Sequence, residues 1–402
     1  MCFLSPSSSS SSRNFVLFLH IRRLSFSPPP PPPSASISAE KSKLQSEHDP
    51  DKALAIYSSL SPRLSSPVSS RYALDLTVRR LAKSRRFSDI ASLVEAQKTH
   101  PQITQEPFLS SLILAYGRAR MPHQAIQTFL DMDRLGTPRS AVSFNALLTA
   151  CNHSQSFDRV PHLFSQITHD YKIKPNKISY GILIKSLCEL GQPESAISIL
   201  NQMKERRIEI TVVTYTTLLD SLYKKGKIEA AQKVWNEMRD DGCSPDVATF
   251  NVRIMRAAIN EKPDDVLKVF DEMLVLGLKP DVVSYNYLMT CYCKNGRMGD
   301  GKRVYEGLKE KGCLPNAATF RTLLHYLCRN GDFDVGLEVF RASAKRGKIP
   351  DFGTMKSLVE GLVKSEKLEE AKGLIAEVKK RVPDRSLDAW KKLERKLRLT
   401  GT

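Results

Sequence analysis

Apolar residues recur at steps of three and four along most of the chain, in runs about one helix long. In the stretch that starts at Val212, the first run is Tyr215, Leu218, Leu219 and Leu222, and the second run is Ala230, Ala231, Val234, Trp235 and Met238. Gly226 separates the two runs, and Gly242 and Pro245 follow the second one. Steps of three and four are the helical period, and Gly and Pro are the residues that interrupt helices. The pattern therefore predicts a helix, a short turn, a second helix and a sharp turn.

The same pattern returns every 35 residues. Similar short segments begin at Val212, Val247, Val282 and Ala317, and each block ends in Pro followed by Asp or Asn, as in Pro245-Asp246. The predicted repeats are 106–140, 141–176 (with one inserted residue), 177–211, 212–246, 247–281, 282–316, 317–351 and a shorter copy at 352–384. One helical pair cannot bury its apolar face alone, so pairs of this kind stack into a solenoid with a continuous core and an elongated concave surface. We expect the first helices to line the inside of this solenoid.

Weaker copies flank the repeats. Residues 71–105 are interpreted as a degenerate repeat, and residues 41–70 as a helical lead-in. Residues 385–402 are predicted to form a basic terminal helix that contains Trp390.

The N-terminal 40 residues have a different composition. No Asp or Glu precedes Glu40, the stretch contains Arg13, Arg22 and Arg23, and Ser7–Ser12 is a serine run. This composition is typical of an organelle transit peptide, which we place at residues 1–40 together with a stiff proline run at residues 28–33. A secretory signal is disfavoured, because the apolar run at residues 15–19 is short and arginines follow it directly. The mitochondrial matrix is the favoured destination and the plastid is the alternative.

The charge of the chain favours a polyanionic partner. Lys and Arg number 61 against 43 Asp and Glu, which gives a net charge of +18. An excess of this size favours nucleic acid first and an anionic membrane second. No apolar run approaches the ~18 residues that a membrane-spanning helix needs. The charge is concentrated at the two ends: residues 71–105 carry seven basic and three acidic residues (+4) and residues 282–402 carry 25 and 15 (+10), whereas residues 212–281 carry 10 and 12 (−2).

A 35-residue period that ends in Pro-Asp and opens on a Val-Thr-Tyr-Asn-like segment closely resembles the P-class pentatricopeptide repeat. The resemblance implies an all-α fold: a right-handed solenoid superhelix of about eight to nine helix-turn-helix repeats. It also implies RNA binding in a plant organelle, because members of this family act in transcript stabilisation, processing, splicing and translation. Helical-repeat readers of RNA assign one base to each repeat, read by two or three side chains.

In this family, the fifth and last residues of a repeat read the base, and the second residue helps to sandwich it. Carried onto this chain, Thr216 with Asp246 matches the guanine pair and Asn251 with Asp281 matches the uracil pair. Asn286 with Asn316 and Asn145 with Asn176 match pyrimidine pairs. The apolar residues at the second position that could clamp bases are Val142, Ile178, Val213 and Val283. The resemblance thus implies a short 5′-G-U-pyrimidine core at the three central repeats.

The outer repeats depart from the family pattern. Gly181 with Thr211 offers little to read, and Ser110 with Ser140 is ambiguous. The pairs Arg321 with Asp351 and Lys356 with Asp384 place a cation at the fifth position. We expect Arg321 and Lys356 to contact phosphate, which positions a strand without reading its sequence.

The cysteines do not predict a metal site. Cys188, Cys293 and Cys328 all stand twelve residues into their repeats, as expected for small side chains packed in a repeated core. No paired CxxC, no H-x-x-x-H and no phosphate-binding glycine loop occurs in the sequence. We therefore expect no metal, no cofactor, no small-molecule substrate and no catalysis.

Three functional hypotheses follow. The favoured one is a mitochondrial RNA-binding solenoid associated with the ribosome, with ribosomal RNA and mitoribosomal proteins as partners and no membrane. The second hypothesis is a free factor specific for one transcript. It is disfavoured because only a few repeats carry a pair of residues that matches a base. The third is a protein-binding scaffold, which would require apolar or aromatic residues on the concave face.

Overall fold

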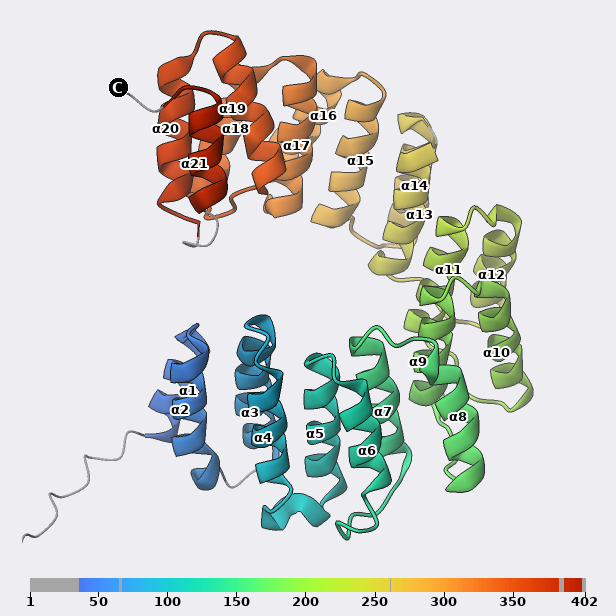
Figure 1. Cartoon of the computed structure of the whole chain (residues 1–402). Coiled ribbons are helices and arrows are strands. Elements are labelled where there is room, and N and C mark those ends of the chain that lie inside the picture. Colours follow the sequence, from blue (N-terminus) through green and yellow to red (C-terminus); the bar gives the residue numbers. More distant parts are fainter. Residues whose placement is uncertain (1–35, 65–66, 261, 383–386, 400–402) are drawn as a thin grey trace, which may run out of the picture.

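A computed structural model describes residues 36–64, 67–260, 262–382 and 387–399. Within these ranges the chain forms helices and no strand. The predicted all-helical solenoid is confirmed, and Figure 1 shows the helices following one another along a wide curve. The first 35 residues of the expected transit peptide lie outside the described residues, and Ile37 already belongs to the first helix.

Eight helical pairs make up the body of the solenoid. The first helices are α5 (Glu106–Arg118), α7 (Ala141–His153), α9 (Lys177–Glu189), α11 (Val212–Lys224), α13 (Val247–Asn260), α15 (Val282–Lys294), α17 (Ala317–Asn330) and α19 (Phe352–Lys364). The second helices are α6 (Pro122–Leu130), α8 (Arg159–Asp170), α10 (Pro193–Glu205), α12 (Ile228–Asp240), α14 (Pro263–Val275), α16 (Met298–Gly307), α18 (Phe333–Lys345) and α20 (Leu368–Lys379).

Shorter elements precede and follow these pairs. They are α1 (Ile37–Ser46), α2 (Pro50–Leu60), the 3₁₀ turn η1 (Ser61–Arg63), α3 (Pro67–Lys83), α4 (Phe87–Gln97), the 3₁₀ turn η2 (Pro101–Thr104) and, at the C-terminal end, α21 (Leu387–Lys396). In α21, Trp390 is buried and its ring meets Phe352 edge-on, with ring centroids 5.0 Å apart. The last helix therefore covers the apolar end of the array. No helix among the described residues is long and apolar enough to cross a membrane.

The chemistry of the turns explains where the helices end. The turn between the first and second helix of a pair has a residue in the left-handed region, which glycine adopts at no steric cost. Gly226 and Gly296 occupy it with φ of 70° and 75°. In two N-terminal pairs the same turn position holds Arg85 and Arg120, with φ of 57° and 58°. These arginines carry a backbone cost of about 1–2 kcal/mol each that glycine would not.

Helices pack in two layers. First helices of successive pairs lie against one another, while each second helix lies against the first helix of its own pair and, at most junctions, against that of the next. In Figure 1, α10 and α12 lie outside α9 and α11, so the first helices form the concave side. The buried apolar side chains form two clusters, Leu44 to Cys291 and Met289 to Leu399, which meet within α15.

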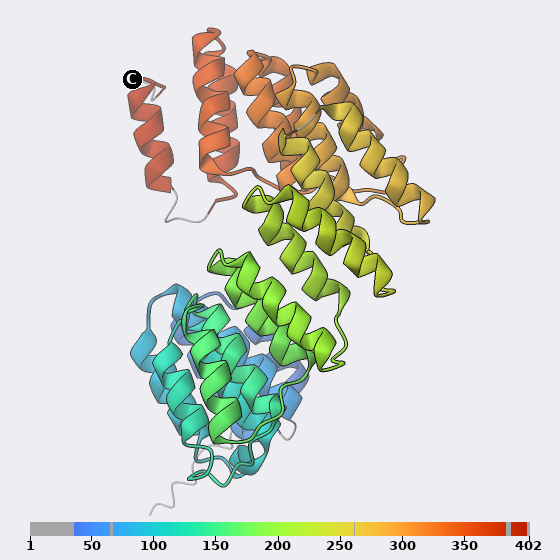
Figure 2. The same ribbon diagram turned by 90° about the vertical axis from the view of Figure 1, so that its right-hand side faces the viewer.

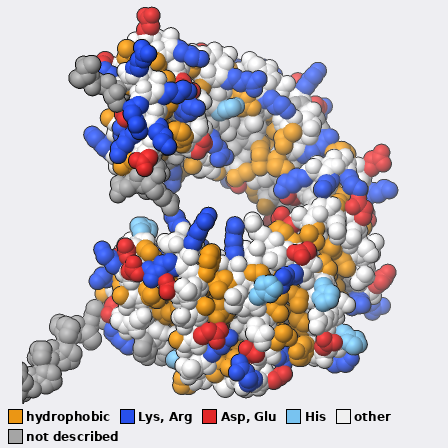
Figure 3. Space-filling model, in the orientation of Figure 1, with side chains coloured by type: hydrophobic (Ala, Val, Ile, Leu, Met, Phe, Trp, Pro, Cys, Tyr) orange, Lys and Arg blue, Asp and Glu red, His pale blue; other side chains and the backbone are white. Residues whose placement is uncertain are grey.

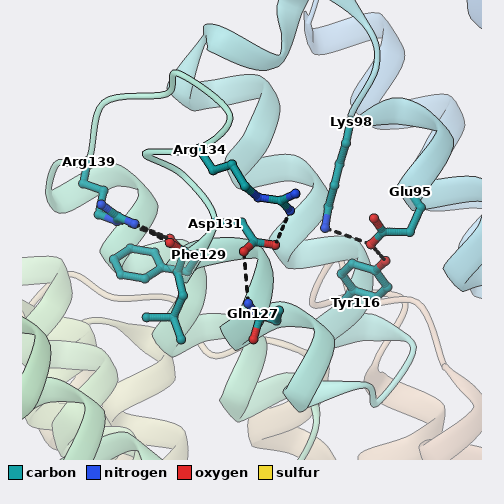
Figure 4. Close-up of polar contacts among 9 residues, drawn as sticks. Glu95, Lys98, Tyr116, Gln127, Phe129, Asp131, Arg134 and Arg139 are labelled. Carbon is teal, nitrogen blue, oxygen red and sulfur yellow. Dashed lines mark hydrogen bonds and ion pairs between the residues drawn. The ribbon is translucent and has the colours of Figure 1, made fainter.

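Figure 4 shows polar contacts around α4, α5 and the end of α6. Lys98 forms a 2.8 Å ion pair with Glu95 of α4, and the Tyr116 hydroxyl of α5 donates a 2.8 Å hydrogen bond to the same carboxylate. Burial and this contact with Glu95 raise the pKa of Tyr116. At the end of α6, Asp131 accepts from Gln127 and Arg134, and Arg139 donates to the Phe129 carbonyl. The Tyr116–Glu95 contact ties α5 to α4, and the other contacts hold the α6–α7 connection against the end of α6.

Candidate RNA-binding surface

The last residue of a repeat is the N-cap of the next first helix. The Asp281 Oδ1 atom accepts hydrogen bonds from the backbone N–H groups of Val283 and Ser284, both at 3.0 Å. Asn176 accepts from Ile178 and Ser179 in the same way, at 3.0 and 3.1 Å. Asn and Asp are favoured at this position because their side chains satisfy N–H groups that the helix leaves without partners. Helix capping therefore holds these last residues in one conformation.

The fifth residue of a repeat is tied to this cap. At the Asn251 junction, Asn251 Nδ2 donates to Asp281 Oδ1 at 3.1 Å, and the Ser284 hydroxyl donates to Asn251 Oδ1 at 2.6 Å. This pair of bonds fixes the amide with its nitrogen toward Asp281. One N–H of Asn251 and the Oδ2 atom of Asp281 have no hydrogen-bond partner among the described residues, and these are the donor and acceptor that a base edge needs.

Two further junctions repeat this geometry. Asn145 donates to Asn176 at 3.2 Å and accepts from Ser179 at 2.6 Å. Asn286 donates to Asn316 at 3.3 Å and accepts from Thr319 at 2.7 Å. The structure thus brings together three of the pairs named from the sequence.

The guanine-type pair differs. The Thr216 hydroxyl lies 2.7 Å from Thr249 Oγ1 and donates to the Val212 carbonyl, and Thr249 in turn donates to Asp246 Oδ1 at 2.8 Å. Thr216 therefore reaches Asp246 only through Thr249, because its side chain is shorter than that of asparagine.

Sequence reasoning missed the third residue of each repeat. Ser179, Thr249, Ser284 and Thr319 are buried, each links the cap to the preceding fifth residue, and each belongs to the capping of its own helix. The signal was available, because a hydroxyl residue stands at this position in every central repeat.

The second residues lie on the surface beside these pairs. Val142, Ile178 and Val213 are exposed, Val213 by 71%, and Val283 is less so. The fifth residues are more recessed, since Asn251 and Asn286 are only 9% and 8% exposed. An exposed aliphatic side chain beside a recessed amide suits a base that stacks on the former and meets the latter with its edge.

A second set of residues that sequence reasoning missed lies on the same face of the first helices as the second residues. The thirteenth residue follows the second by eleven positions, which is close to three full turns of an α-helix, so both face the same way. The cations at this position are Arg118, Lys224, Lys294, Arg329 and Lys364. Lys224 pairs with Asp220 at 2.6 Å, whereas Arg329 and Lys364 are exposed and form no ion pair with another described residue. Arg118 pairs with Asp75, and Lys294 donates to the Ile259 carbonyl. A row of cations at this spacing suits contact with a phosphate backbone.

At the N-terminal junction a carboxylate adds to the cap that Ser140 forms with Val142 N. Ser110 is 5% exposed, and its hydroxyl has no hydrogen-bond partner among the described residues. Glu106 also accepts from the backbone N–H groups of Ser140 and Ser143, at 2.8 and 2.9 Å. Burial alone would raise the pKa of Glu106, but the hydrogen bonds from Ser143 and Ser140 outweigh it and hold that pKa below the usual glutamate range. This junction therefore lacks the contact between fifth and last residues that the Asn251 junction has.

The C-terminal pairs carry exposed charge. Arg321 is exposed near Asp351, which caps α19 by accepting from Thr354 N at 3.1 Å. Lys356 lies 3.8 Å from Glu360, one turn along α19, and its expected partner Asp384 lies outside the described residues.

The cysteines lie within the packing of the solenoid. Cys291 and Cys293 are buried, and burial raises the pKa of Cys293 to about 11, so this thiol stays protonated at neutral pH. Cys188 shares its repeat position, and burial raises its pKa to about 11 as well. Within the described residues, His, Cys, Asp and Glu side chains form no cluster of three that could hold a metal ion.

Models of one repeat family match this chain along most of its helical pairs. The PPR repeat family model matches residues 175–224, 211–258 and 280–329, the pentatricopeptide repeat domain model matches 111–189, and the PPR repeat model matches 248–278, 318–347 and 353–381. Together these matches cover more than half of the chain.

Curated relatives from Arabidopsis thaliana match part of the chain. The small ribosomal subunit protein mL103 (rPPR7) is 61% identical over 172 residues, which is 42% of each chain. A mitochondrial pentatricopeptide repeat-containing protein is 57% identical over 173 residues, 43% of this chain and 41% of the relative. The small ribosomal subunit protein mS79 (rPPR3b) is 35% identical over 133 residues, 33% of this chain and 34% of the relative. The chain therefore spans about two fifths or less of the length of these relatives.

Among solved structures, the pentatricopeptide repeat protein PPR10 from maize aligns with 88% of this chain and 60% of its own, at 19% identity and a TM-score of 0.47. The matches to the repeat models rest on the same residues that build the helical pairs and their capped junctions. The chain belongs to the pentatricopeptide-repeat family.

Proposed function

We propose that this chain is a non-catalytic RNA-binding protein of the mitochondrial ribosome that acts in translation. The observation that carries the proposal is the row of capped junctions at Asn251 and Asn286, where two polar side chains are held together beside exposed aliphatic side chains. Amide and carboxylate groups at fixed spacing suit the Watson-Crick edge of a splayed base.

The similarity to proteins named as small ribosomal subunit proteins, and to relatives named as mitochondrial, supports the ribosome and the mitochondrial matrix as the place of action. The plastid is the alternative location. Ribosomal RNA and mitoribosomal proteins are the proposed partners.

The number of junctions that can read a base argues for a protein held in a larger assembly. Three consecutive repeats, read at Thr216, Asn251 and Asn286, would select a 5′-G-U-pyrimidine core. Each good base contact discriminates by about 1–3 kcal/mol, which for three bases is too little to select one site among many transcripts.

A free factor that protects or processes one transcript is the second candidate. A protein-binding scaffold is the third candidate. It is disfavoured because the junctions carry polar Asn and Asp side chains, whereas a scaffold would require apolar or aromatic residues there.

Sedimentation separates these candidates. A mitochondrial lysate is fractionated on a sucrose gradient with and without ribonuclease, and the protein is followed by antibody. Co-migration with a ribosomal subunit that only high salt disrupts is the expected result. A light fraction that shifts on ribonuclease treatment would instead support the free factor, and a light fraction that ribonuclease leaves unchanged would support the scaffold.

A further inference from the structure

The solenoid curves so far that its two basic ends face each other. Figure 3 shows a hollow between the N-terminal and C-terminal parts of the molecule, with blue side chains on both sides of it. Figures 1 and 2 both show α1–α5 and α17–α21 on opposite sides of this open space. The two regions that carry the excess positive charge of the repeats, residues 71–105 and 282–402, are therefore brought opposite each other by the fold.

Different turns face the hollow from the two sides. In the N-terminal part, the turns from first to second helix, after α3 and α5, point toward it (Figure 1). In the C-terminal part, the turns from second to first helix, after α16 and α18, and the C-terminal end of α20 point toward it. The solenoid twists between the two parts, so opposite ends of the helical pairs face the hollow on its two sides.

The N-terminal edge consists of Lys83, Arg85 and Arg120. All three are exposed, and none forms an ion pair with another described residue. Arg85 and Arg120 occupy the left-handed turn position where Gly226 and Gly296 stand in later repeats. Because glycine fits this backbone better than arginine, the local fold does not require these two arginines.

The C-terminal edge is a set of cations from the last three repeats. It consists of Lys309, Lys345, Arg346, Lys348 and Lys380, all exposed and without an ion pair to another described residue. Of the two preceding turns, the α12 turn combines Arg239 with Asp240 and Asp241, and the α14 turn has Leu274 and Val275. The turns after α18 and α20 therefore carry more cations than the turns after α12 and α14.

We propose that these two edges form a clamp for double-stranded RNA, distinct from the row of base-reading junctions. A duplex exposes two phosphate backbones on opposite sides and hides its base edges, so it is bound through shape and phosphate contacts. Two facing rows of unpaired cations match that arrangement, whereas a single strand suits the groove beside Asn251. The inference rests on the proposed RNA-binding function and names the form of RNA that the ends bind.

The test uses the full chain and a 20-base-pair RNA duplex of arbitrary sequence, with binding followed by fluorescence anisotropy at several salt concentrations. One variant removes two of the three cations of the N-terminal edge (Arg85→Gly with Arg120→Gly). Another removes three of the five cations of the C-terminal edge (Lys345→Gln, Arg346→Gln and Lys348→Gln). The matched control neutralises three exposed cations outside both edges: Lys233→Gln, Arg239→Gln and Lys279→Gln.

Each edge variant is expected to bind the duplex about tenfold more weakly, and the slope of log K against log salt should become shallower by about one unit for each phosphate that is no longer neutralised. The glycine variant is expected to melt no lower than the wild type, so its weaker binding cannot be attributed to unfolding. If either edge variant binds like the control, the clamp is refuted. If the wild-type chain does not bind the duplex at all, the proposal also fails, and an acidic protein becomes the candidate for these edges.

A single-stranded RNA that contains the G-U-pyrimidine core is measured in parallel. An Asn251→Ala variant is expected to bind this strand more weakly and to retain duplex binding. Failure of the duplex alone to bind the wild type overturns the clamp, whereas failure of the single strand to bind the wild type overturns the base-reading proposal.

Discussion

The Ser284 hydroxyl donates a 2.6 Å hydrogen bond to the amide oxygen of Asn251, which belongs to the repeat before it. Ser284 also lies at the third position of its own helix, where it donates to the capping residue Asp281 at 3.1 Å. One buried hydroxyl therefore links helix initiation in one repeat to the orientation of the reading side chain in the previous one.

Replacing Ser284 with alanine should release the Asn251 amide. The change leaves the amide oxygen without its donor and weakens the cap, at a cost of about 1–3 kcal/mol. Selectivity between uracil and cytosine at that base should fall along with the melting temperature. Thr214→Ala is the matched control, since Thr214 follows the repeat whose fifth residue is Gly181. It should lower stability and leave selectivity unchanged, and an equal fall in selectivity in both variants would contradict the link.

Changing Asn251 to threonine should alter the base that is preferred. The variant acquires the Thr-Asp combination that Thr216 and Asp246 already have, so the preference at that position should move from uracil toward guanine by about 1–3 kcal/mol. Competition binding with single-stranded RNAs that differ at one base measures it. An unchanged preference would show that Asn251 does not read the base.

The row of cations at the thirteenth position should contribute affinity without sequence preference. Replacing Lys224, Arg329 and Lys364 with glutamine should weaken binding to every single strand alike. The slope of log K against log salt should decrease by about 0.7 for each phosphate that the variant no longer neutralises. A change confined to one RNA sequence would mean that these residues read bases.

Gly117 sets the closest approach between α5 and α7. A Cβ atom added there would lie 2.4 Å from the Ala150 Cα atom, so Gly117→Ala forces the two backbones apart. Overpacking of this kind costs about 1–3 kcal/mol, measurable by urea unfolding. Gly373→Ala in α20 is the control, because its Cβ would meet nothing within 4 Å and removing a helical glycine gains about 0.5–1 kcal/mol. A neutral Gly117→Ala would refute the close approach.

Glu106 should make the N-terminal repeats sensitive to acid. Its pKa is lowered in the folded chain, so its contribution to stability is present above the unfolded pKa of about 4.3 and is lost as the pH falls through the lower folded pKa. The stability difference between the wild type and Glu106→Gln should therefore be full at pH 7 and shrink below about pH 4. Melting curves across this range measure it, with Glu229→Gln at an exposed site of α12 as the control. If the stability difference between the wild type and Glu106→Gln does not vary with pH, the stabilisation comes from the shape of the side chain and not from its charge.

Local chemistry explains why part of the site was predictable. Asp281 and Ser284 are three residues apart, and a capping pair acts over that distance, so the sequence alone predicts where α15 begins. Whether Asn251 reads uracil stays a prediction. The burial of Ser110 was not predictable, because it depends on how closely α5 and α7 pack and on Glu106, which reaches the helix that follows.

The sequence by itself determined the helical pairs, their 35-residue period and the chemistry of their caps, because these depend on residues a few positions apart. Only the tertiary structure decided that the third residues join neighbouring repeats and that two basic ends, far apart in the chain, face each other across a hollow. The physical reason is that the path of a solenoid sums the small rotation at every junction, and each rotation depends on side-chain packing between helices that the periodicity does not specify.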